Sequence, residues 1–446
     1  MEQHFIRQIQ ILRQKAAALM LYQSVVATPA GEAFLQILDA LVEGNGLRDG
    51  LRDRTTLQVL RAYGLWVTAL AKAQQSWRDY VVAQVLLADN PFTQHIQSKP
   101  LSTLPQRLMN AAQDDLRNLQ SFYECHGDQV AQWVQQATGS AAPSGVWDEA
   151  VPAVLPSAAA GAIAHTLHKT SDWGQALEEL ATYHQTAGVG LFAQYRALRW
   201  VAGTLVGVAA PDPVDLDALV GYDLPRQLLL QNTEALMAGY SALHVLLYGS
   251  RGAGKSSMVK ALLNRYGDRG LRLIEVNRAD LRDLIEIVEV LRNLPQRFII
   301  FVDDLSFEED DDAFKSLKVV LEGTVTARPI NVVVYATSNR RHLIREFMGD
   351  RPRPKDADEV HAWDTVQEKL SFGDRFGLTL TFEPANQDTY LTIIHHLAQR
   401  ENIALDASDL EFRALQWATR HNGRSGRTAR QFIDFLKADL ALNPAS

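Results

Sequence analysis

The feature that most constrains the fold is a glycine-rich loop, "GSRGAGKS", which spans residues 249–256. It follows an apolar run, "HVLLY", and leads into a helical pattern, "KSSMVKALLNRY". The pattern G-x-x-x-x-G-K-[ST] between a strand and a helix is typical of a loop that binds phosphate. Its glycines let main-chain N–H groups turn inward without a Cβ in the way, and the helix N-terminus adds positive potential. The alternative, a glycine-rich turn with a chance lysine, is disfavoured because both flanking elements are present.

Two side chains of this loop are expected to act on the ligand directly. Lys255 would place a point charge on the terminal phosphates, and the Ser256 hydroxyl would complete a Mg²⁺ shell. The residues expected to contact a nucleotide here are Gly249, Ser250, Arg251, Gly252, Ala253, Gly254, Lys255, Ser256 and Ser257.

A second apolar run, "RFIIFV", ends in a pair of aspartates, Asp303 and Asp304. A carboxylate at such a strand end can hold magnesium through water, and the next one can orient or deprotonate an attacking water. By itself the pair would more simply cap a helix or form a turn, but its combination with the phosphate loop favours the catalytic interpretation. The acidic run that follows, 308–312, is expected to form a solvated helix start favoured by the helix dipole.

Further polar groups accompany the later strands. The run "INVVVYATSN" ends in Asn339, whose side chain can reach water beside a terminal phosphate only if this strand lies between the other two. The alternative is a simple strand-end turn. Arg375 stands just before the last predicted strand, and Arg424, Arg427 and Arg430 stand at the start of the final helix. An arginine supplied to a transferring phosphoryl group strongly accelerates the reaction, although each of these alone would more simply be a surface charge or an ion-pair partner.

The chain divides into a helical part and an α/β part. Residues 1–210 show apolar residues at helical spacing and predict an α-helical N-terminal domain, with an Ala/Pro-rich linker near 138–163 and a further helical stretch at 164–208. From 218 to 383, β-branched runs alternate with helical segments and predict a parallel sheet buried on both faces. Residues 384–446 predict helices that would form a small lid. We therefore expect an α/β fold of the P-loop NTPase type.

Composition narrows the possible function classes. A hydrophobic content of 47% in 446 residues predicts globular domains, and a net charge of −8 argues against non-specific coating of nucleic acid. The single cysteine, Cys125, excludes an intrachain disulfide, and with only His126 beside it cannot form a zinc site. No apolar run reaches the ~20 residues that a membrane-spanning helix needs. We expect a cytoplasmic protein without a membrane span.

The chain resembles the AAA+ ATPase superfamily in the order of five features. These are the phosphate loop, the two aspartates at one strand end, the asparagine at another, the tripeptide Asp-Arg-Phe and an arginine of the lid. The segment "LVGYDLPRQLLLQNTEALMAG" looks like the part that packs on adenine in that superfamily, with Val220 and Gly221 nearest the base. More narrowly, the run from Gly221 through "YATSNRRHL" to "SGRTARQF" resembles a bacterial family of predicted AAA+ ATPases without an assigned biological role. The superfamily resemblance covers about residues 218–446.

The resemblance implies ATP and Mg²⁺ as ligands and a role for each matched residue. Lys255 and Ser256 would bind phosphate and magnesium, and Asp303 would serve magnesium. Asp304 stands where most of the superfamily has glutamate. Because aspartate is one methylene shorter, the attacking water must sit closer, which is compatible with hydrolysis and leaves both fast and slow turnover open.

The resemblance also implies the residues that would sense the terminal phosphate. Asn339 would be the first sensor, and Arg427, with Arg430 as the fallback, would be the second. Arg375 would be an arginine finger that serves a neighbouring subunit, so a homo-oligomer is expected.

Three functions stay open from the sequence. The first is an ATPase that remodels or loads a protein partner, which the N-terminal helices would engage. The second is an ATP-gated scaffold or switch with slow or no turnover. The third, a P-loop kinase, is less favoured because it would not need the Asn339 strand, Asp-Arg-Phe or a lid arginine. The hypothesis of a nucleic-acid partner is supported only by the basic stretch "NRRHLIREFMGDRPRPK". This stretch lacks aromatic residues at the spacing that would let bases stack on them.

Overall fold

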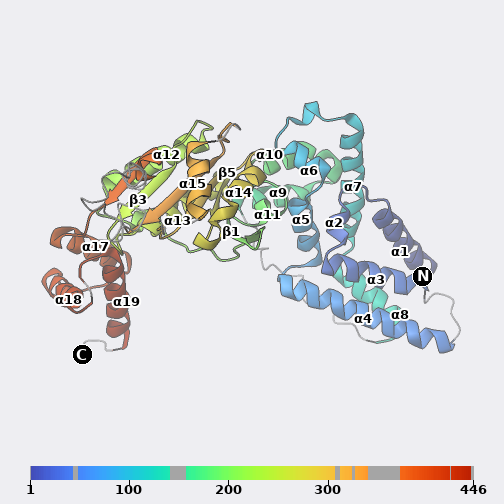
Figure 1. Cartoon of the computed structure of the whole chain (residues 1–446). Helices are drawn as coiled ribbons and strands as arrows, with labels where there is room; N and C mark the ends of the chain where they lie inside the picture. The colour runs from blue at the N-terminus through green and yellow to red at the C-terminus, as the bar shows by residue number, and fades with distance from the viewer. Residues whose placement is uncertain are drawn as a thin grey trace. The chain divides into compact units, whose positions relative to one another are not determined.

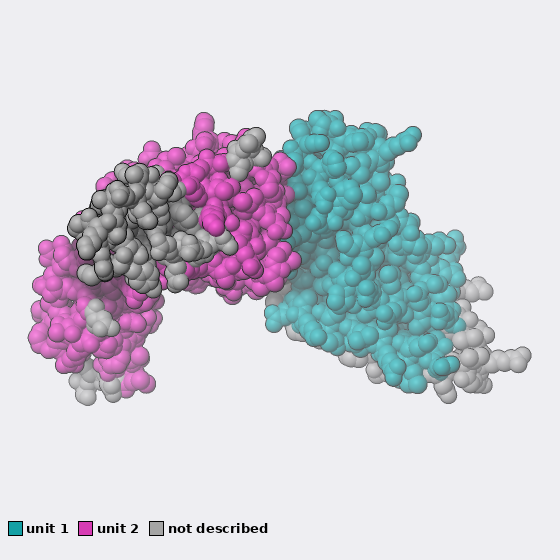
Figure 2. Space-filling model, viewed as in Figure 1, with its two compact units in different colours: residues 1–194 teal, residues 195–446 magenta. Residues whose placement is uncertain are grey.

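The computed structural model describes most of the chain. The described residues are 2–43, 49–140, 157–306, 312–323, 327–339, 372–421 and 423–442. Most of the expected linker, most of the acidic run and nearly all of the basic stretch after Asn339 therefore lie outside the described residues. By their contacts, the residues form two compact units, 1–194 and 195–446 (Figure 2).

The unit of residues 1–194 is helical, as the spacing of its apolar residues predicts. An aromatic cluster lies in its core, where the rings of Phe34 and Trp77 stack at a centroid distance of 4.6 Å. Trp66 and Phe122 complete the cluster, and all four side chains are buried. Large aromatic residues thus supply much of the apolar surface that this unit buries. Its α-helices are α1 (Glu2–Ala17), α2 (Gln23–Val26), α3 (Pro29–Glu43), α4 (Asp49–Ala73), α5 (Trp77–Leu87), α6 (Pro91–Ile96), α7 (Gln106–Glu124), α8 (Gly127–Thr138), α9 (Ala158–Lys169), α10 (Leu177–Ala187) and α11 (Gly190–Gln194).

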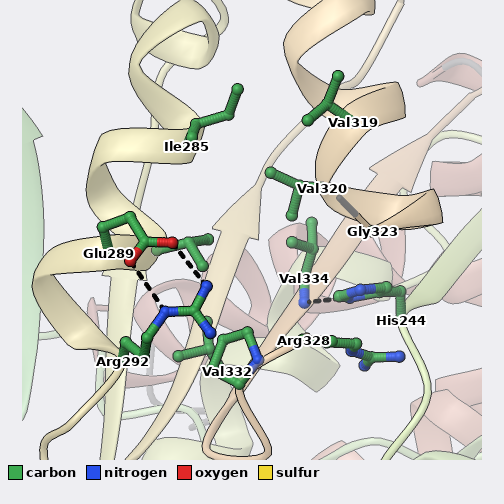
Figure 3. A pocket seen from close by; sticks show the side chains of 12 residues that line it. His244, Ile285, Glu289, Arg292, Val319, Val320, Gly323, Arg328, Val332 and Val334 are labelled. Carbon is green, nitrogen blue, oxygen red and sulfur yellow. Dashed lines mark hydrogen bonds and ion pairs between the residues drawn. The ribbon is translucent and has the colours of Figure 1, made fainter. Parts of the chain in front are cut away.

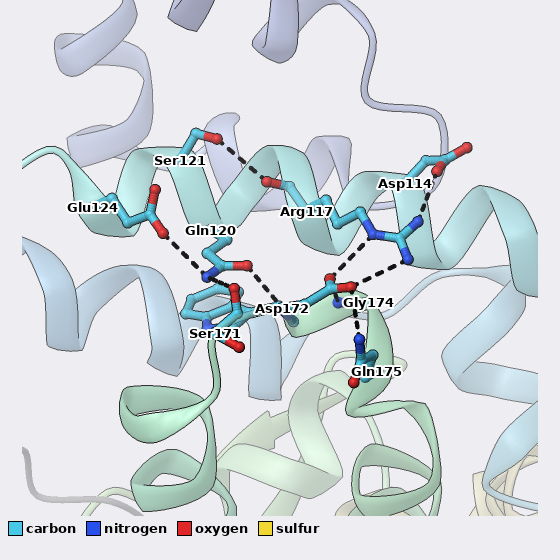
Figure 4. Close-up of polar contacts among 10 residues, drawn as sticks. Asp114, Arg117, Gln120, Ser121, Glu124, Ser171, Asp172, Gly174 and Gln175 are labelled. Atoms are coloured by element: carbon cyan, nitrogen blue, oxygen red, sulfur yellow. Dashed lines mark hydrogen bonds and ion pairs between the residues drawn. The ribbon is translucent and has the colours of Figure 1, made fainter.

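Polar side chains of α7 hold the turn between α9 and α10 (Figure 4). Arg117 Nε donates to Asp172 Oδ1 at 3.1 Å, and Gln120 Nε2 donates to the Ser171 carbonyl at 2.9 Å. Gln120 Oε1 in turn accepts the main-chain N–H of Trp173 at 2.9 Å. Because these contacts join segments that are far apart in the sequence, they stabilise the tertiary fold of the helical unit.

The unit of residues 195–446 is built on a seven-stranded sheet with the order β2-β1-β4-β5-β6-β3-β7. Neighbouring strands pair in parallel except β1 and β2, which are antiparallel. The central strands are buried along nearly their whole length, which explains their continuous apolar runs. The expected α/β fold is confirmed. The strands that the sequence predicted are β3 (Val245–Gly249), β4 (Leu271–Glu275), β5 (Arg297–Val302), β6 (Val332–Ser338) and β7 (Leu378–Phe382).

Strands β1 (Ala197–Val201) and β2 (Thr204–Gly207) correct one expectation. The sequence predicted helix throughout 164–208, within the helical N-terminal domain, and the last part of that prediction is wrong. A two-residue turn joins the strands, and its residues Ala202 and Gly203 have positive φ angles of 49° and 81°. Such a turn favours a hairpin, and burial in β1 alternates over its last four residues as in a strand with one buried face.

Helices pack on the sheet, and the chain continues after β7 into the helices of the lid (Figure 1). The apolar sides of α12 and α13 pack on one face of the sheet, against Tyr335 and Phe301 among others. The lid helices α17, α18 and α19 have a hydrophobic cluster of their own, which includes Tyr390 and Ile433. No helix in the described ranges is long and apolar enough to cross a membrane. The α-helices of this unit are α12 (Asp223–Met237), α13 (Lys255–Tyr266), α14 (Leu284–Leu291), α15 (Asp312–Glu322), α17 (Gln387–Arg400), α18 (Ala407–Arg420) and α19 (Gly426–Leu442).

Candidate nucleotide-binding site

Three strand ends meet at one edge of the sheet. Strand β6 lies between β3, which leads into the phosphate loop, and β5, which leads into the aspartate pair. The register pairs Tyr248 with Ser338 and Val302 with Ala336, so all three strands end at nearly the same level. Asn339 can reach water beside a terminal phosphate only if its strand lies between the other two, and β6 is the middle strand of the three. This strand order, with a helical lid after the last strand, gives the α/β fold of the P-loop NTPase type that the sequence predicts.

The glycines of the phosphate loop allow close approaches on two sides. Gly249 has a φ of 141°, and a Cβ there would lie 2.0 Å from the carbonyl oxygen of Phe382, at the end of β7. Gly252 has a φ of 76°, and a Cβ there would lie 2.8 Å from Ser425 Oγ, just before α19. Since neither position has room for a side chain, glycine is required for the loop to fit between β7 and the lid.

Lys255 lies at the start of α13 with only 6% of its surface exposed. Its Nζ donates to the carbonyls of Gly249 and Ser250, at 2.9 and 2.8 Å, and to Asn339 Oδ1 at 3.1 Å. Burial lowers the pKa of Lys255, and the nearby Asp304 carboxylate opposes this effect. The ammonium group thus points into the curve of the loop. There it could exchange neutral carbonyl oxygens for phosphate oxygens, which form stronger charge-assisted hydrogen bonds.

One carboxylate oxygen of Asp303 accepts several hydrogen bonds. Its Oδ1 accepts Ser256 Oγ at 2.6 Å, Thr337 Oγ1 at 2.5 Å and the main-chain N–H of Asp304 at 3.1 Å. The serine hydroxyl and the carboxylate are hard oxygen ligands of the kind that Mg²⁺ prefers, with its remaining positions taken by water and phosphate oxygens. The two residues proposed for magnesium are therefore side by side and fit that ion.

Asp304 adopts a left-handed backbone conformation, with a φ of 51°. Its Oδ1 accepts Asn339 Nδ2 at 2.7 Å, while the Oδ1 of the same asparagine accepts from Lys255. Asn339 therefore bridges the lysine of the phosphate loop and the second aspartate. A single amide can hold both groups because its oxygen accepts and its nitrogen donates.

The segment expected to pack on adenine runs between the phosphate loop and the lid. Gly221 has a φ of 90°, and a Cβ there would lie 2.7 Å from Thr389 Cγ2 of α17. Val220 packs against the hydrophobic cluster of the lid, and a Cβ on Gly254 would lie 3.7 Å from Leu219. These contacts put both residues named from the sequence against the lid, while the preceding Leu219 lies near the loop.

The arginines of the final helix differ in their surroundings. The main-chain N–H of Arg427 donates to the Gly252 carbonyl at 3.1 Å, and its exposed side chain contributes a positive charge near Lys255. Arg430 instead pairs with Glu401 and Asp434 within the lid. The structure thus brings Arg427 to the loop and gives the fallback residue another partner. Arg424, the remaining arginine, donates to Gln387 Oε1 at 3.0 Å.

Arg375 also lies outside this group of residues. It ends the 3₁₀ turn Phe372–Arg375, three residues before Leu378, which pairs with Val245 at the start of β3. The phosphate loop follows the other end of β3, about 13 Å away along the strand. The Arg375 guanidinium forms an ion pair with Glu322 at the end of α15.

Sequence reasoning missed the part of Thr337 in this site. Its place in the run "INVVVYATSN" gives no signal of this contact, because a β-branched hydroxyl residue in a strand is common. The parallel pairing of β5 and β6 is what places its hydroxyl on the aspartates, and no pattern in the sequence predicts that contact.

A separate hollow lies between α14 and α15, near the amino end of β6 and away from the phosphate loop (Figure 3). Its walls are mostly aliphatic. Glu289 and Arg292 on its rim pair with each other at 2.6 Å, and His244 Nδ1 accepts the Val334 N–H at 2.9 Å. Burial lowers the pKa of His244 to about 3, so the ring is neutral. Glu289, Arg292 and His244 Nδ1 are thus engaged within the protein, and we assign no chemistry to the hollow.

Residues 193–440, more than half of the chain, match a family described as "Protein of unknown function (DUF815)". The chain belongs to this family. The match starts just before β1, so it includes the hairpin of β1 and β2. The expectation of a family without an assigned biological role is confirmed.

Individual relatives are more distant. The acetoin catabolism regulatory protein of Cupriavidus necator is 29% identical over 177 residues, which cover 34% of this chain and 26% of that protein. The chain thus spans about a quarter of the length of this curated relative.

Solved structures with some similarity include two bacterial proteins. The RuvB Holliday junction branch migration motor of Thermotoga maritima is 16% identical, over 52% of this chain and 66% of that chain, with a TM-score of 0.35. AMPPCP-bound DnaA of Aquifex aeolicus is 18% identical, over 51% of this chain and 67% of that chain, with a TM-score of 0.36. Both likenesses are distant.

Proposed function

We propose that this chain binds ATP with Mg²⁺ and hydrolyses it in order to remodel or load a protein partner. The observation that carries the proposal is the hydrogen-bonded series from Lys255 through Asn339 to Asp304, beside the Ser256–Asp303 pair. A purely structural turn would not need a lysine, two carboxylates and an amide to converge from three separate strand ends.

In this proposal each group has one task. The main-chain N–H groups of the loop and Lys255 hold the phosphates, and Ser256 and Asp303 hold the metal. Bound Mg²⁺ would neutralise the negative charge that develops on the phosphate oxygens. Asp304 orients the attacking water or takes its proton, and Asn339 keeps that carboxylate near the terminal phosphate. Arg427 brings a positive charge from the lid.

The helical unit of residues 1–194 would engage the partner, and the chain would act as a homo-oligomer in the cytoplasm. An ATP-gated scaffold with slow or no turnover is the second candidate. It is favoured by the aspartate at position 304, which is shorter than glutamate and so places the carboxylate further from a water molecule.

The first test is a steady-state assay of phosphate release from MgATP with the full-length protein and no added acceptor. We expect turnover that requires Mg²⁺ and rises when the partner is present. Turnover that stays very slow with every partner would favour the scaffold. Phosphate transfer to a small molecule without hydrolysis would contradict the proposal and support a kinase.

Arg375→Ala tests whether an arginine is supplied to a neighbouring subunit. We expect normal ATP binding but a fall of about 100-fold or more in hydrolysis, because an arginine on the transferring phosphoryl group stabilises the transition state. Mixing this variant with Lys255→Ala should restore part of the activity, since a mixed interface pairs an intact loop with an intact arginine.

The matched control is Glu322→Gln, which removes the ion-pair partner of Arg375 but keeps the arginine. If the arginine serves a neighbour, this control should hydrolyse ATP at nearly the wild-type rate. If it serves only the local ion pair, both variants should lose activity together and mixing should restore nothing. That second result, with specific activity independent of protein concentration, would remove the neighbouring-subunit role.

A further inference from the structure

Three consecutive residues at the end of β6 contact three consecutive residues after β5. The Thr337 carbonyl accepts the Leu305 N–H at 2.7 Å, and Ser338 Oγ donates to the Leu305 carbonyl at 2.9 Å. Asn339 Nδ2 donates to Asp304 Oδ1 at 2.7 Å. The turn that carries both aspartates is therefore held by the neighbouring strand end and not only by its own main chain.

The Thr337 hydroxyl occupies the centre of this arrangement. It donates to Asp303 Oδ1 at 2.5 Å and accepts the main-chain N–H of Asp304 at 2.9 Å. Only 2% of the residue is exposed, so water does not compete for these bonds. Because a hydroxyl has one proton and that proton points at Asp303, the direction of each bond is fixed.

These contacts act on the two carboxylates in different ways. On Asp303, the donors that the described residues supply all reach Oδ1, and none of them reaches Oδ2. That pattern orients the carboxylate and leaves Oδ2 for another ligand. On Asp304, the bond to the main-chain N–H holds the residue in the left-handed conformation, which non-glycine residues adopt only when their surroundings impose it.

Packing alone does not explain a threonine here. Val332, Val333 and Val334 occupy the same strand, so a valine of nearly equal size would suit the backbone of β6. A valine would, however, leave both the Asp303 oxygen and the Asp304 N–H without this partner. The hydroxyl is what distinguishes the two side chains.

We infer that Thr337 is a positioning residue for both aspartates: it orients the one that serves Mg²⁺ and fixes the backbone of the one that serves the attacking water. In this role it acts through its bonds to the two aspartates. The inference rests on the proposed function, since it needs magnesium and a water molecule to act there.

The test compares Thr337→Val, Thr337→Ser and the wild type in the full-length protein. ATP binding is measured by calorimetry with Mg²⁺ and with EDTA, followed by kcat for hydrolysis. In Thr337→Val, we expect unchanged affinity in EDTA, but a loss of about 10- to 100-fold in the Mg²⁺-dependent gain in affinity and in kcat, as for other residues that orient metal ligands. Thr337→Ser, which keeps the hydroxyl, should stay within about threefold of the wild type.

Ser338→Ala is the matched control, because it removes a buried hydroxyl bond from the same strand end without touching either carboxylate. It should lower the unfolding temperature at least as much as Thr337→Val while keeping the Mg²⁺ effect. If Thr337→Val retains the full Mg²⁺ effect while Asp303→Asn loses it, the positioning role is wrong and the proposed function stands. If the wild type shows no Mg²⁺-dependent ATP binding, the proposed function itself fails and this inference fails with it.

Discussion

Replacing Lys255 with alanine is expected to weaken binding of MgATP by about 100-fold or more. The lysine offers charged donors from the inside of the phosphate loop, and hydrogen bonds to charged groups contribute about 1.5–3 kcal/mol each. Losing about 3 kcal/mol corresponds to roughly two powers of ten in affinity. Isothermal titration calorimetry with MgATP measures this directly, and the unfolding temperature shows whether the variant is folded.

Lys260→Ala is the matched control, because this lysine lies on the same helix but faces outward, 3.8 Å from Asp212. Its removal should leave the affinity for MgATP within about twofold of the wild-type value, because a solvent-accessible ion pair contributes little free energy. If Lys255→Ala binds ATP as tightly as the wild type while remaining folded, the loop is not the nucleotide site. The substitution should weaken nucleotide binding without unfolding the protein. The reason is that the lysine side chain bonds two loop carbonyls and Asn339, and no residue of the hydrophobic core.

Asp304→Asn is expected to keep ATP binding within a few-fold of the wild type and to lower kcat by about 10²–10⁴-fold. The amide has nearly the same shape, and its oxygen can still accept from Asn339, but it cannot take a proton from water. Single-turnover hydrolysis and nucleotide binding, measured on the same preparation, separate the two effects.

Asp268→Asn provides the comparison, since this aspartate pairs with Arg196 on the protein surface, at 2.6 Å. That substitution should change neither binding nor kcat. Unchanged hydrolysis in Asp304→Asn would place the catalytic base elsewhere, and Glu308, which lies outside the described residues, would be the next candidate.

The residues that meet at the candidate site could be predicted from the sequence because they belong to short local patterns. The phosphate loop and the aspartate pair each follow an apolar strand, and parallel strands of one sheet bring their carboxyl ends to the same edge. The order of the strands cannot be read from such patterns. The position of Asn339 between the lysine and the second aspartate depended on that order, and only the structure supplied it.

The hairpin at residues 197–207 and the lid contacts show where local patterns fail. The hairpin strands are short and follow several helices, so their alternation is easily taken for the end of a helix. Arg424, just before the final helix, and Arg427 and Arg430 within it look alike in the sequence. In the structure their contacts differ. The main chain of Arg427 bonds to Gly252 of the loop, whereas the side chain of Arg430 pairs with two acidic residues of the lid.

The contact between Gly252 and the start of α19 also has a consequence for how the protein is assembled. The loop is formed near the middle of the chain, but the wall against which it closes comes from Ser425 and Arg427. Contacts between segments so far apart in sequence carry a cost in loop-closure entropy, because the long intervening chain must be closed into a loop. A fragment that ends before Ser425 would keep the lysine and both aspartates yet lack that wall. Nucleotide binding measured on such a fragment would therefore report on an open loop and underestimate the affinity of the whole unit.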